Sequence, residues 1–173
     1  TDIRVLECAT MVAGPFCGRM LAFSGADVIK IEPTFHGAPP RRREPTVEGI
    51  HGPEGSLLFQ YLNANKKGVT LDIRKPTGRD LLRRLVVLSD VLIEDWEPGF
   101  LESLGLPYTE LAKLNPQLIM VSVTPFGQYG RHRQWKAYDL NTTHIGGGGW
   151  VTPTGLSRRL FPERPPLKMG GHV

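Results

Sequence analysis

The sequence predicts an α/β fold, in which a Rossmann-like parallel sheet lies between helices on both faces in three αβα layers. Five short apolar runs have the length of strands that are buried on both faces. They cover residues 3–8, 28–31, 69–73, 91–93 and 118–123. Helical segments separate these runs, and such alternation requires crossover connections that bury a parallel sheet between helical layers.

The clearest helical segment covers residues 77–88. Its leucines and Val86 form an apolar face opposite three arginines, with Thr77 expected as the cap and Asp80 in the first turn. Shorter helices are predicted at residues 57–62, 100–104 and 108–114. Residues 33–55 are rich in proline and glycine, which predicts a long loop that carries Arg41, Arg42 and Arg43 as mobile cations.

Composition limits the class of protein. The chain has 173 residues, 40% hydrophobic and 22% charged, which suits one globular domain rather than a disordered chain. Neither an apolar window of about 18 residues nor a secretion signal is found, so we expect no membrane association. Two isolated cysteines, Cys8 and Cys17, favour a reducing cytoplasm over a disulfide scaffold or metal site. We expect Cys17 to be a buried structural thiol.

The net charge of +4 favours an anionic small molecule. This charge is modest for a nucleic-acid binder, and the basic residues lack interleaved aromatic residues that stack on bases, so we expect no nucleic-acid partner.

Ligands of such sheets collect beyond the carboxyl ends of the strands. The first loop there covers residues 9–15, where Ala13-Gly14-Pro15 is typical of a helix start whose amides face an anion. A merely tight turn is the alternative. Glu32 ends the second strand, where a Rossmann protein keeps its ribose-binding acid, but A-G-P-x-x-G has two glycines instead of three. A dinucleotide site is therefore the weaker interpretation.

Four ordered blocks carry a resemblance to a known family. They read "AGPFCGRMLAFSGADVIKIE", "NANKKGVTLDIRKPTG", "SDVLIEDWEPGFLESLGLPYTELAKLNPQLIMVSVTPFGQYG" and "YDLNTTHIGGGGWVTPTG". In order and spacing they resemble the family III CoA-transferases, or CaiB/BaiF family, from Ile3 to about Lys168.

The resemblance implies an enzyme that moves coenzyme A from an acyl-CoA to a small carboxylic acid without a metal or redox cofactor. Family members have a Rossmann-like large domain, form interlocked dimers and are more than twice this length. Residues 1–173 are therefore expected to be the N-terminal, CoA-binding portion of the large domain, without the small domain and the C-terminal part. The partner would be a second copy or a second transferase half.

The resemblance also implies CoA contacts. These fall on Val12, Ala13, Leu71, Asp72, Ile73, Arg74, Asp95, Trp96, Glu97, Trp135, Lys136, Ala137, Tyr138 and Asp139. Arg74 and Lys136 can donate to phosphates. As alternatives, Trp96 is a core aromatic residue and Asp139 a helix cap.

The chain departs from the family at three positions. Pro33 and Ser103 stand where arginines are often found, and the cluster of Arg41–Arg43 is a candidate replacement for one of them. Tyr138 stands where racemases of the family have a histidine; a tyrosine with a pKa near 10 is a poor base at neutral pH, which favours transfer over racemisation. His132 is expected to be solvated in a charged turn.

The family's transfer mechanism uses a nucleophilic aspartate, which alignment of "PPLKMGG" places just past Val173. The sequence has no aspartate after Asp139. His172 is interpreted as a loop residue, and residues 146–149 as glycines at which backbone packs closely. Three hypotheses stay open: an active CoA-transferase, a catalytically silent transferase half, and an NAD-dependent oxidoreductase.

Overall fold

A computed structural model describes residues 2–147 of the chain. The strands are β1 (Arg4–Cys8), β2 (Asp27–Glu32), β3 (Lys67–Thr70), β4 (Val91–Glu94) and β5 (Ile119–Ser122). The helices are α1 (Ala13–Phe23), α2 (Leu57–Asn63), α3 (Pro76–Val87), α4 (Phe100–Ser103), α5 (Tyr108–Leu114) and α6 (Asp139–Ile145), with a short 3-10 helix η1 (Pro39–Arg42).

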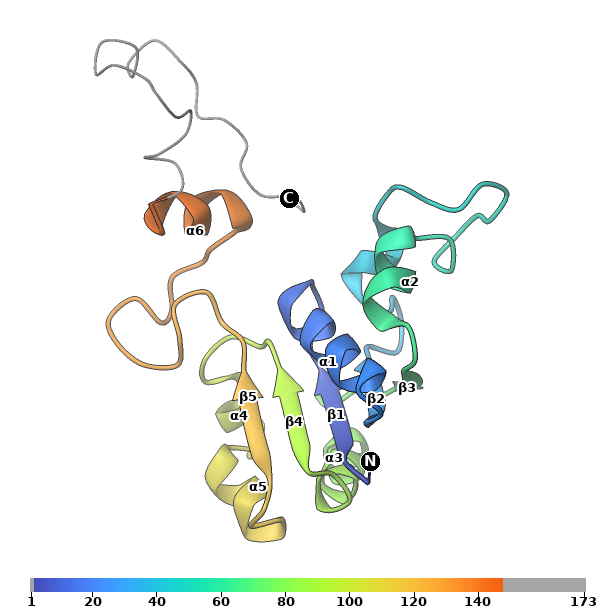
Figure 1. The fold of residues 1–173 in the computed structure, drawn as a ribbon. Coiled ribbons are helices and arrows are strands. Elements are labelled where there is room, and N and C mark those ends of the chain that lie inside the picture. The colour runs from blue at the N-terminus through green and yellow to red at the C-terminus, as the bar shows by residue number, and fades with distance from the viewer. Residues whose placement is uncertain (1, 148–173) are drawn as a thin grey trace, which may run out of the picture.

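In this described part of the chain, five parallel strands form one sheet in the order β3-β2-β1-β4-β5 (Figure 1). The chain runs outward from β1 to β3, and α3 then carries it back across the sheet to β4. The strand order therefore reverses between β1 and β4. At their carboxyl ends Cys8 pairs with Glu94, which brings the following loops together.

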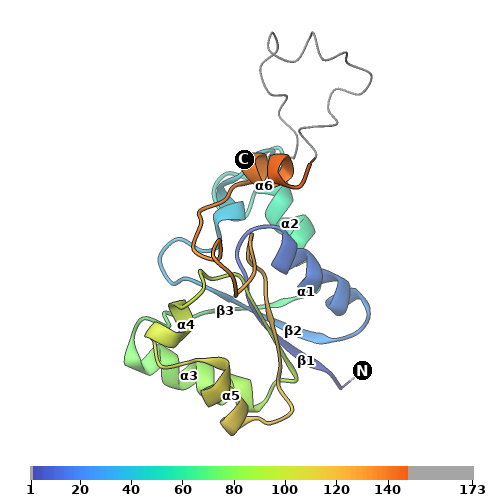
Figure 2. The ribbon, with the colours of Figure 1, turned by 90° about the vertical axis from the view of Figure 1, so that its left-hand side faces the viewer.

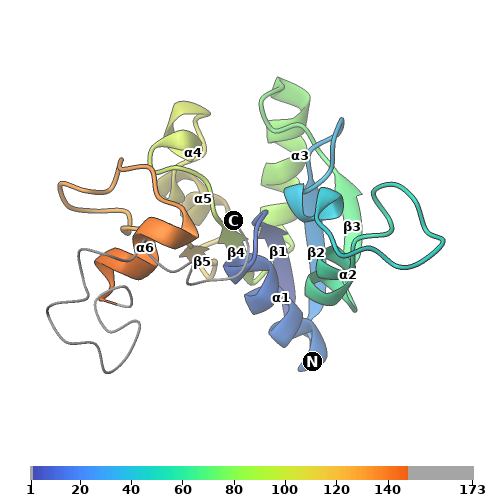
Figure 3. The same cartoon turned by 90° about the horizontal axis from the view of Figure 1, so that it is seen from above.

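The helices form two layers around the sheet. α1 lies on one face, while α3, α4 and α5 lie on the other (Figures 2 and 3). Val5, Ala9 and Val28 pack under α1. Leu6, Leu82 and Leu111 belong to a larger core on the opposite face. The predicted three-layer α/β fold is confirmed.

The outer strands correct one prediction. β3 is exposed along its whole length, and Ile119 and Val121 of β5 are exposed, because both strands lie at edges of the sheet. β3 also ends at Thr70, so the predicted strand over residues 69–73 was misplaced. Leu71 and Ile73 are apolar because they pack onto the α3 side of the core after the strand has ended.

Two local predictions also change. α3 begins at Pro76 with Lys75 in the capping position, so Thr77 lies inside the helix and does not cap it, and no acid lies in the first turn. Proline fits the first helical position because its fixed φ suits a helix and its missing N–H has no intrahelical partner there. Among residues 2–147, no helix has the length and apolar character to cross a membrane.

Candidate functional site

The loops after β1 and β4 meet at the point where the strand order reverses. The Asp95 carboxylate, after β4, accepts hydrogen bonds from the backbone N–H of Thr10 at 2.6 Å and of Met11 at 3.2 Å. The Thr10 hydroxyl donates to the same carboxylate. Asp95 thus fixes the loop that carries Val12 and Ala13, at the position where open α/β sheets bind ligands.

The two glycines of A-G-P-x-x-G allow α1 to lie close to the sheet. A Cβ at Gly14 would overlap the side chain of Ala9, and a Cβ at Gly18 would overlap the carboxylate of Glu7. Both glycines are therefore explained by helix–strand packing instead of by the approach of a phosphate. Proline at position 15 is buried in the first turn of α1.

A buried ion cluster lies beneath this loop. Glu7 of β1 is in contact with two ammonium groups, Lys30 Nζ at 2.8 Å and Lys66 Nζ at 2.6 Å. Lys30 also donates to the backbone oxygen of Ala9, and Lys66 to that of Pro15, each at 2.7 Å. The side chains of all three are at most 2% exposed. We call Glu7, Lys30 and Lys66 the buried ion cluster.

Glu32 is also bound by a cation. Arg41 Nε and Nη2 each donate to its carboxylate at 2.8 Å, and the Ala38 N–H donates at 2.7 Å. Burial raises the pKa of Glu32, but the hydrogen bonds from Arg41 and Ala38 outweigh it and hold the pKa below its ordinary value. The guanidinium also lies over the Phe59 ring.

The prediction of a mobile cation at position 41 was therefore wrong. Arg41 lies in η1, and the turn of this 3-10 helix places the Arg41 side chain at the end of β2. Its bonds to Glu32 leave it unsuited to replace a phosphate contact. Arg42 and Arg43 are exposed.

An open cleft of about 760 Å³ lies on the other side of the reversal point, beside β4 and β5. Glu94, Trp96, Glu97 and Ser122 are among its lining residues. Burial raises the pKa of Glu94, even though the Ser122 side chain and the backbone N–H of Trp96 both donate to its carboxylate. Among residues 2–147, no cation forms an ion pair with Glu94.

Trp96 has the core packing expected of a structural aromatic residue, and its predicted CoA contact stays a prediction. Its ring lies 5.5 Å from that of Phe100 and packs against the larger core, yet it also lines the cleft.

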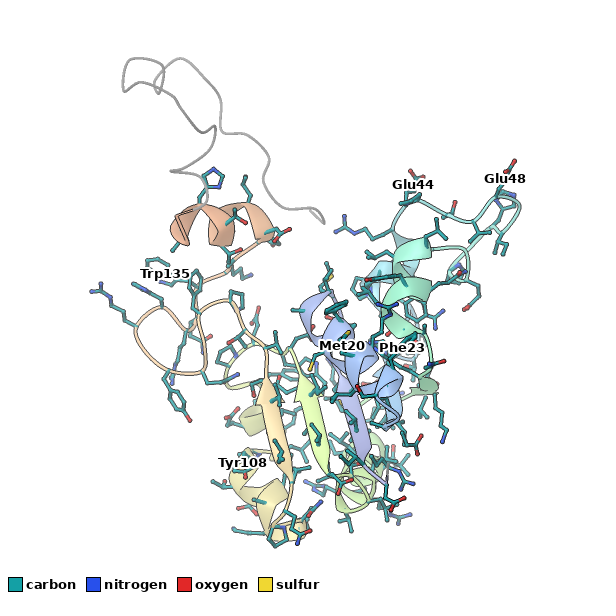
Figure 4. All side chains as sticks on the ribbon, in the orientation of Figure 1. Met20, Phe23, Glu44, Glu48, Tyr108 and Trp135 are labelled. Atoms are coloured by element: carbon teal, nitrogen blue, oxygen red, sulfur yellow. The ribbon has the colours of Figure 1, made fainter. Side chains whose placement is uncertain are left out.

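The segment between β5 and α6 closes one side of this cleft. Arg133 and Gln134 line the cleft, and Gln134 donates to the backbone oxygen of Pro98. Trp135 is 55% exposed on this segment and lies at the outer side of the molecule (Figure 4). His132 is half-buried rather than fully solvated, and its ring packs on that of Trp135 with centroids 4.0 Å apart.

The other predicted contacts lie around the same edge of the sheet. Lys136 and Tyr138 are exposed, and Ala137 is partly buried. Asp139 is the first residue of α6, and the capping position belongs to Tyr138. Asp72 accepts from the Arg74 N–H, while the Arg74 side chain is exposed. Cys17 is half-buried rather than buried, at the margin of the core under α1.

A sequence model of CoA-transferase family III matches residues 1–173. The chain belongs to CoA-transferase family III. The resemblance predicted from the sequence is therefore confirmed. In this family III chain, the loops after β1 and β4 lie where the strand order of the α/β sheet reverses.

Curated relatives of this family III chain are longer. The succinyl-CoA–D-citramalate CoA-transferase of Chloroflexus aurantiacus is 42% identical over 170 residues, which cover 98% of this chain and 39% of the relative. The succinyl-CoA–L-malate CoA-transferase beta subunit of the same organism is 39% identical over 146 residues, 84% of this chain and 35% of the relative. This chain therefore spans about two fifths of the curated relatives it matches.

A solved structure has the same fold. The crystal structure of a CaiB/BaiF family protein from Brucella suis superposes with a TM-score of 0.79 and 37% sequence identity, covering 98% of this chain and 43% of that protein.

The sequence predictions missed three features of this candidate site: the buried ion cluster, Thr10 and Glu94. A signal for the cluster was present, because Glu7 and Lys30 interrupt runs that were predicted to be buried on both faces. A charge in such a strand requires a partner. His172, Gly148, Gly149 and the expected position of the nucleophile lie outside the described residues.

Proposed function

We propose that this chain is the N-terminal, CoA-binding part of the large domain of an acyl-CoA:carboxylate CoA-transferase. The observation that carries the proposal is the junction at the reversal point, where Asp95 holds Thr10 and Met11 beside a cleft lined by Trp96 and Glu97. Relatives named for CoA transfer between dicarboxylic acids support the reaction class.

The proposed CoA contacts are the residues predicted from the sequence on the loops after β1, β3 and β4 and before α6. CoA needs donors for its phosphates, and the exposed cations of Arg74 and Lys136 can supply them. The Asp95 carboxylate is already bound by backbone amides, so its part is to hold the loop of Val12 and Ala13.

The reaction proceeds, in this proposal, through an aspartyl intermediate. The aspartate carboxylate attacks the donor thioester, giving a mixed anhydride and CoA thiolate. The thiolate attacks the aspartyl carbonyl and expels the donor acid, leaving CoA bound as an enzyme thioester. The acceptor carboxylate then repeats these steps in reverse. We assign the nucleophile to a residue just past Val173, and the partner to a second copy of the chain.

A second candidate is a catalytically silent half that pairs with an active subunit. The similarity to a protein named as a beta subunit favours it, because that name implies a second type of chain. The residue at the aspartate position of the full gene distinguishes the two candidates: an aspartate supports the first, and any residue without a carboxyl group supports the second.

The site argues against the dinucleotide interpretation. Gly14 and Gly18 serve packing, and Glu32 is bound by Arg41, so neither is available to a pyrophosphate or ribose.

Calorimetric titration of the native protein with CoA and with NAD tests the proposal. We expect CoA to bind, NAD not to bind, and Lys136→Ala to weaken CoA binding by about tenfold through loss of a charge-assisted hydrogen bond. Arg84→Ala, which removes an exposed cation from α3, is the matched control and should leave the affinity unchanged. Retention of NAD without CoA would overturn the proposal.

A further inference from the structure

The loop between β1 and α1 is held at both ends by charged side chains. At its start, Lys30 binds the backbone oxygen of Ala9, and at its end Lys66 binds that of Pro15. Asp95 binds the amides of Thr10 and Met11 between them. Residues 12 and 13, the proposed CoA contacts, therefore lie between fixed points.

The two lysines share one anchor. Both ammonium groups contact the Glu7 carboxylate inside the sheet. The two lysines that bind the ends of the loop are therefore held in place by the same acid. Gly18 allows this arrangement, because any side chain there would displace the Glu7 carboxylate. Asn63 at the end of α2 accepts a further hydrogen bond from Lys66 at 3.1 Å. A shift of Lys66 would therefore move the first turn of α1.

The cluster also has a charge that suits its position. Two ammonium groups and one carboxylate leave one net positive charge when both lysines are protonated. It lies under the first turn of α1, an eleven-residue helix whose N-terminus is itself partly positive. Both features attract an anion to the loop, and the Asp95 carboxylate on the amides of Thr10 and Met11 offsets part of this attraction.

We infer that Lys66 is a positioning residue of the CoA site, which fixes the first turn of α1 and supplies the positive charge beneath it. This inference rests on the proposed function. Lys66 makes its contribution through the backbone of Pro15 and through Glu7, so it is not a catalytic residue.

The lysine is poised to change its charge within an accessible pH range. Burial lowers the pKa of Lys66 to about 8, while Glu7 opposes the shift. The titratable groups facing it are Glu7 on β1, Lys30 on β2 and the Cys17 thiol on α1. Deprotonation above pH 8 removes the net positive charge, so CoA affinity should fall as the pH rises through this value.

Lys67 provides a matched control. It is the next residue, carries the same charge, and pairs with Asp27 at 71% exposure on the outer strand β3. Lys66→Met should weaken CoA binding by at least about tenfold in the native protein, whereas Lys67→Met should not change it. Lys66→Arg, which keeps the charge and the donors, should restore most of the affinity and remove the fall above pH 8.

Three results of the CoA-binding measurements would overturn the inference. Equal CoA affinity of Lys66→Met and the native protein would overturn it, and so would an equal loss in Lys67→Met. If Lys66→Met does not fold, a pH profile that is the same in Lys66→Arg and the native protein would overturn it. Absence of CoA binding to the native protein would instead mean that the proposed function has failed. In that case the positioning role is still tested by hydrogen exchange of the amides of residues 11–13, which should be faster in Lys66→Met only.

Discussion

The acids at the carboxyl ends of three neighbouring strands have different surroundings. On the β1–β2 side, Glu7 contacts two lysines and Glu32 binds Arg41 through two nitrogens. On the β4 side, Glu94 accepts hydrogen bonds from neutral groups and lines an open cleft. On the β1–β2 side, ion pairs hold the backbone in place. On the β4 side, an acid without an ion pair among the described residues lines the cleft.

This difference separates acids that hold the backbone in place through ion pairs from an acid that, within residues 2–147, lines the cleft without one. Breaking a buried ion pair leaves an unpaired charge and is costly, so the β1–β2 side should tolerate substitution poorly. Removing an acid that burial already penalises should cost little, so the β4 side should tolerate it well.

The largest effect is expected for Glu7→Gln. The substitution leaves Lys30 and Lys66 without their carboxylate, and we expect a loss of about 3–5 kcal/mol in the free energy of unfolding, measured with urea. Glu110→Gln removes an exposed acid paired with Lys113 and should cost at most about 0.5 kcal/mol. Similar losses in the two variants would remove the distinction between the buried ion cluster and an ordinary surface pair.

Arg41→Met should have the next largest effect. It removes two hydrogen bonds to the mostly buried Glu32, and we expect a loss of about 2–3 kcal/mol in the free energy of unfolding. The neighbouring Arg42 is exposed, so Arg42→Met should change it by less than about 0.5 kcal/mol. A mobile Arg41, as the sequence predicted, would give two equal results.

Gly18→Ala tests how closely α1 rests on the cluster. The added methyl group would displace the Glu7 carboxylate, and we expect a loss of about 1–3 kcal/mol by urea denaturation. Gly68→Ala places the same group in open space on β3 and serves as the control. A Gly18→Ala variant as stable as the control would show that the carboxylate can move freely.

The smallest effects concern pH and have opposite signs. The pKa of Glu32 is lowered on folding, so its contribution is present above the ordinary glutamate pKa and is lost as the pH falls through the folded-state value. The pKa of Glu94 is raised, so its ionisation reduces stability as the pH rises above the ordinary value.

Thermal melting at several pH values measures this contrast. At pH 7, Glu32→Gln should lower the melting temperature and Glu94→Gln should raise it. The difference for Glu94→Gln should disappear as the pH falls to the ordinary glutamate pKa, whereas the difference for Glu32→Gln should disappear only at lower pH, because the folded-state pKa of Glu32 lies below the ordinary value. Two shifts of the same sign would contradict the contrast between the sides.

The fold was predictable because apolar runs and amphipathic segments alternate in the sequence. The edge strands were not, since a β-branched run such as Val69 and its neighbours has the same pattern whether one or both faces are covered. Which strands lie at the edges depends on the order β3-β2-β1-β4-β5, which is a property of the whole chain.

The site was predictable at the level of loops. Asp95 was expected through the family resemblance, but its bond to Thr10, 85 residues away in the chain, depends on the pairing of β1 with β4. Arg41 was misjudged because its loop is rich in proline and glycine, and only the fold shows that the chain turns back toward Glu32. Lys66 and Lys67 look alike in the sequence, and only the fold shows that Lys66 packs against the first turn of α1 while Lys67 lies exposed on β3.

The side-by-side lysines also differ in their chemical fate. Acyl thioesters, the proposed substrates, are electrophiles that can acylate free amines. The Lys67 side chain is 71% exposed and open to such damage, whereas the Lys66 side chain is 2% exposed and its ammonium group contacts Glu7, Asn63 and the backbone oxygen of Pro15. The lysine whose loss would disturb the proposed site is thus the one whose side chain is shielded from a stray acyl donor.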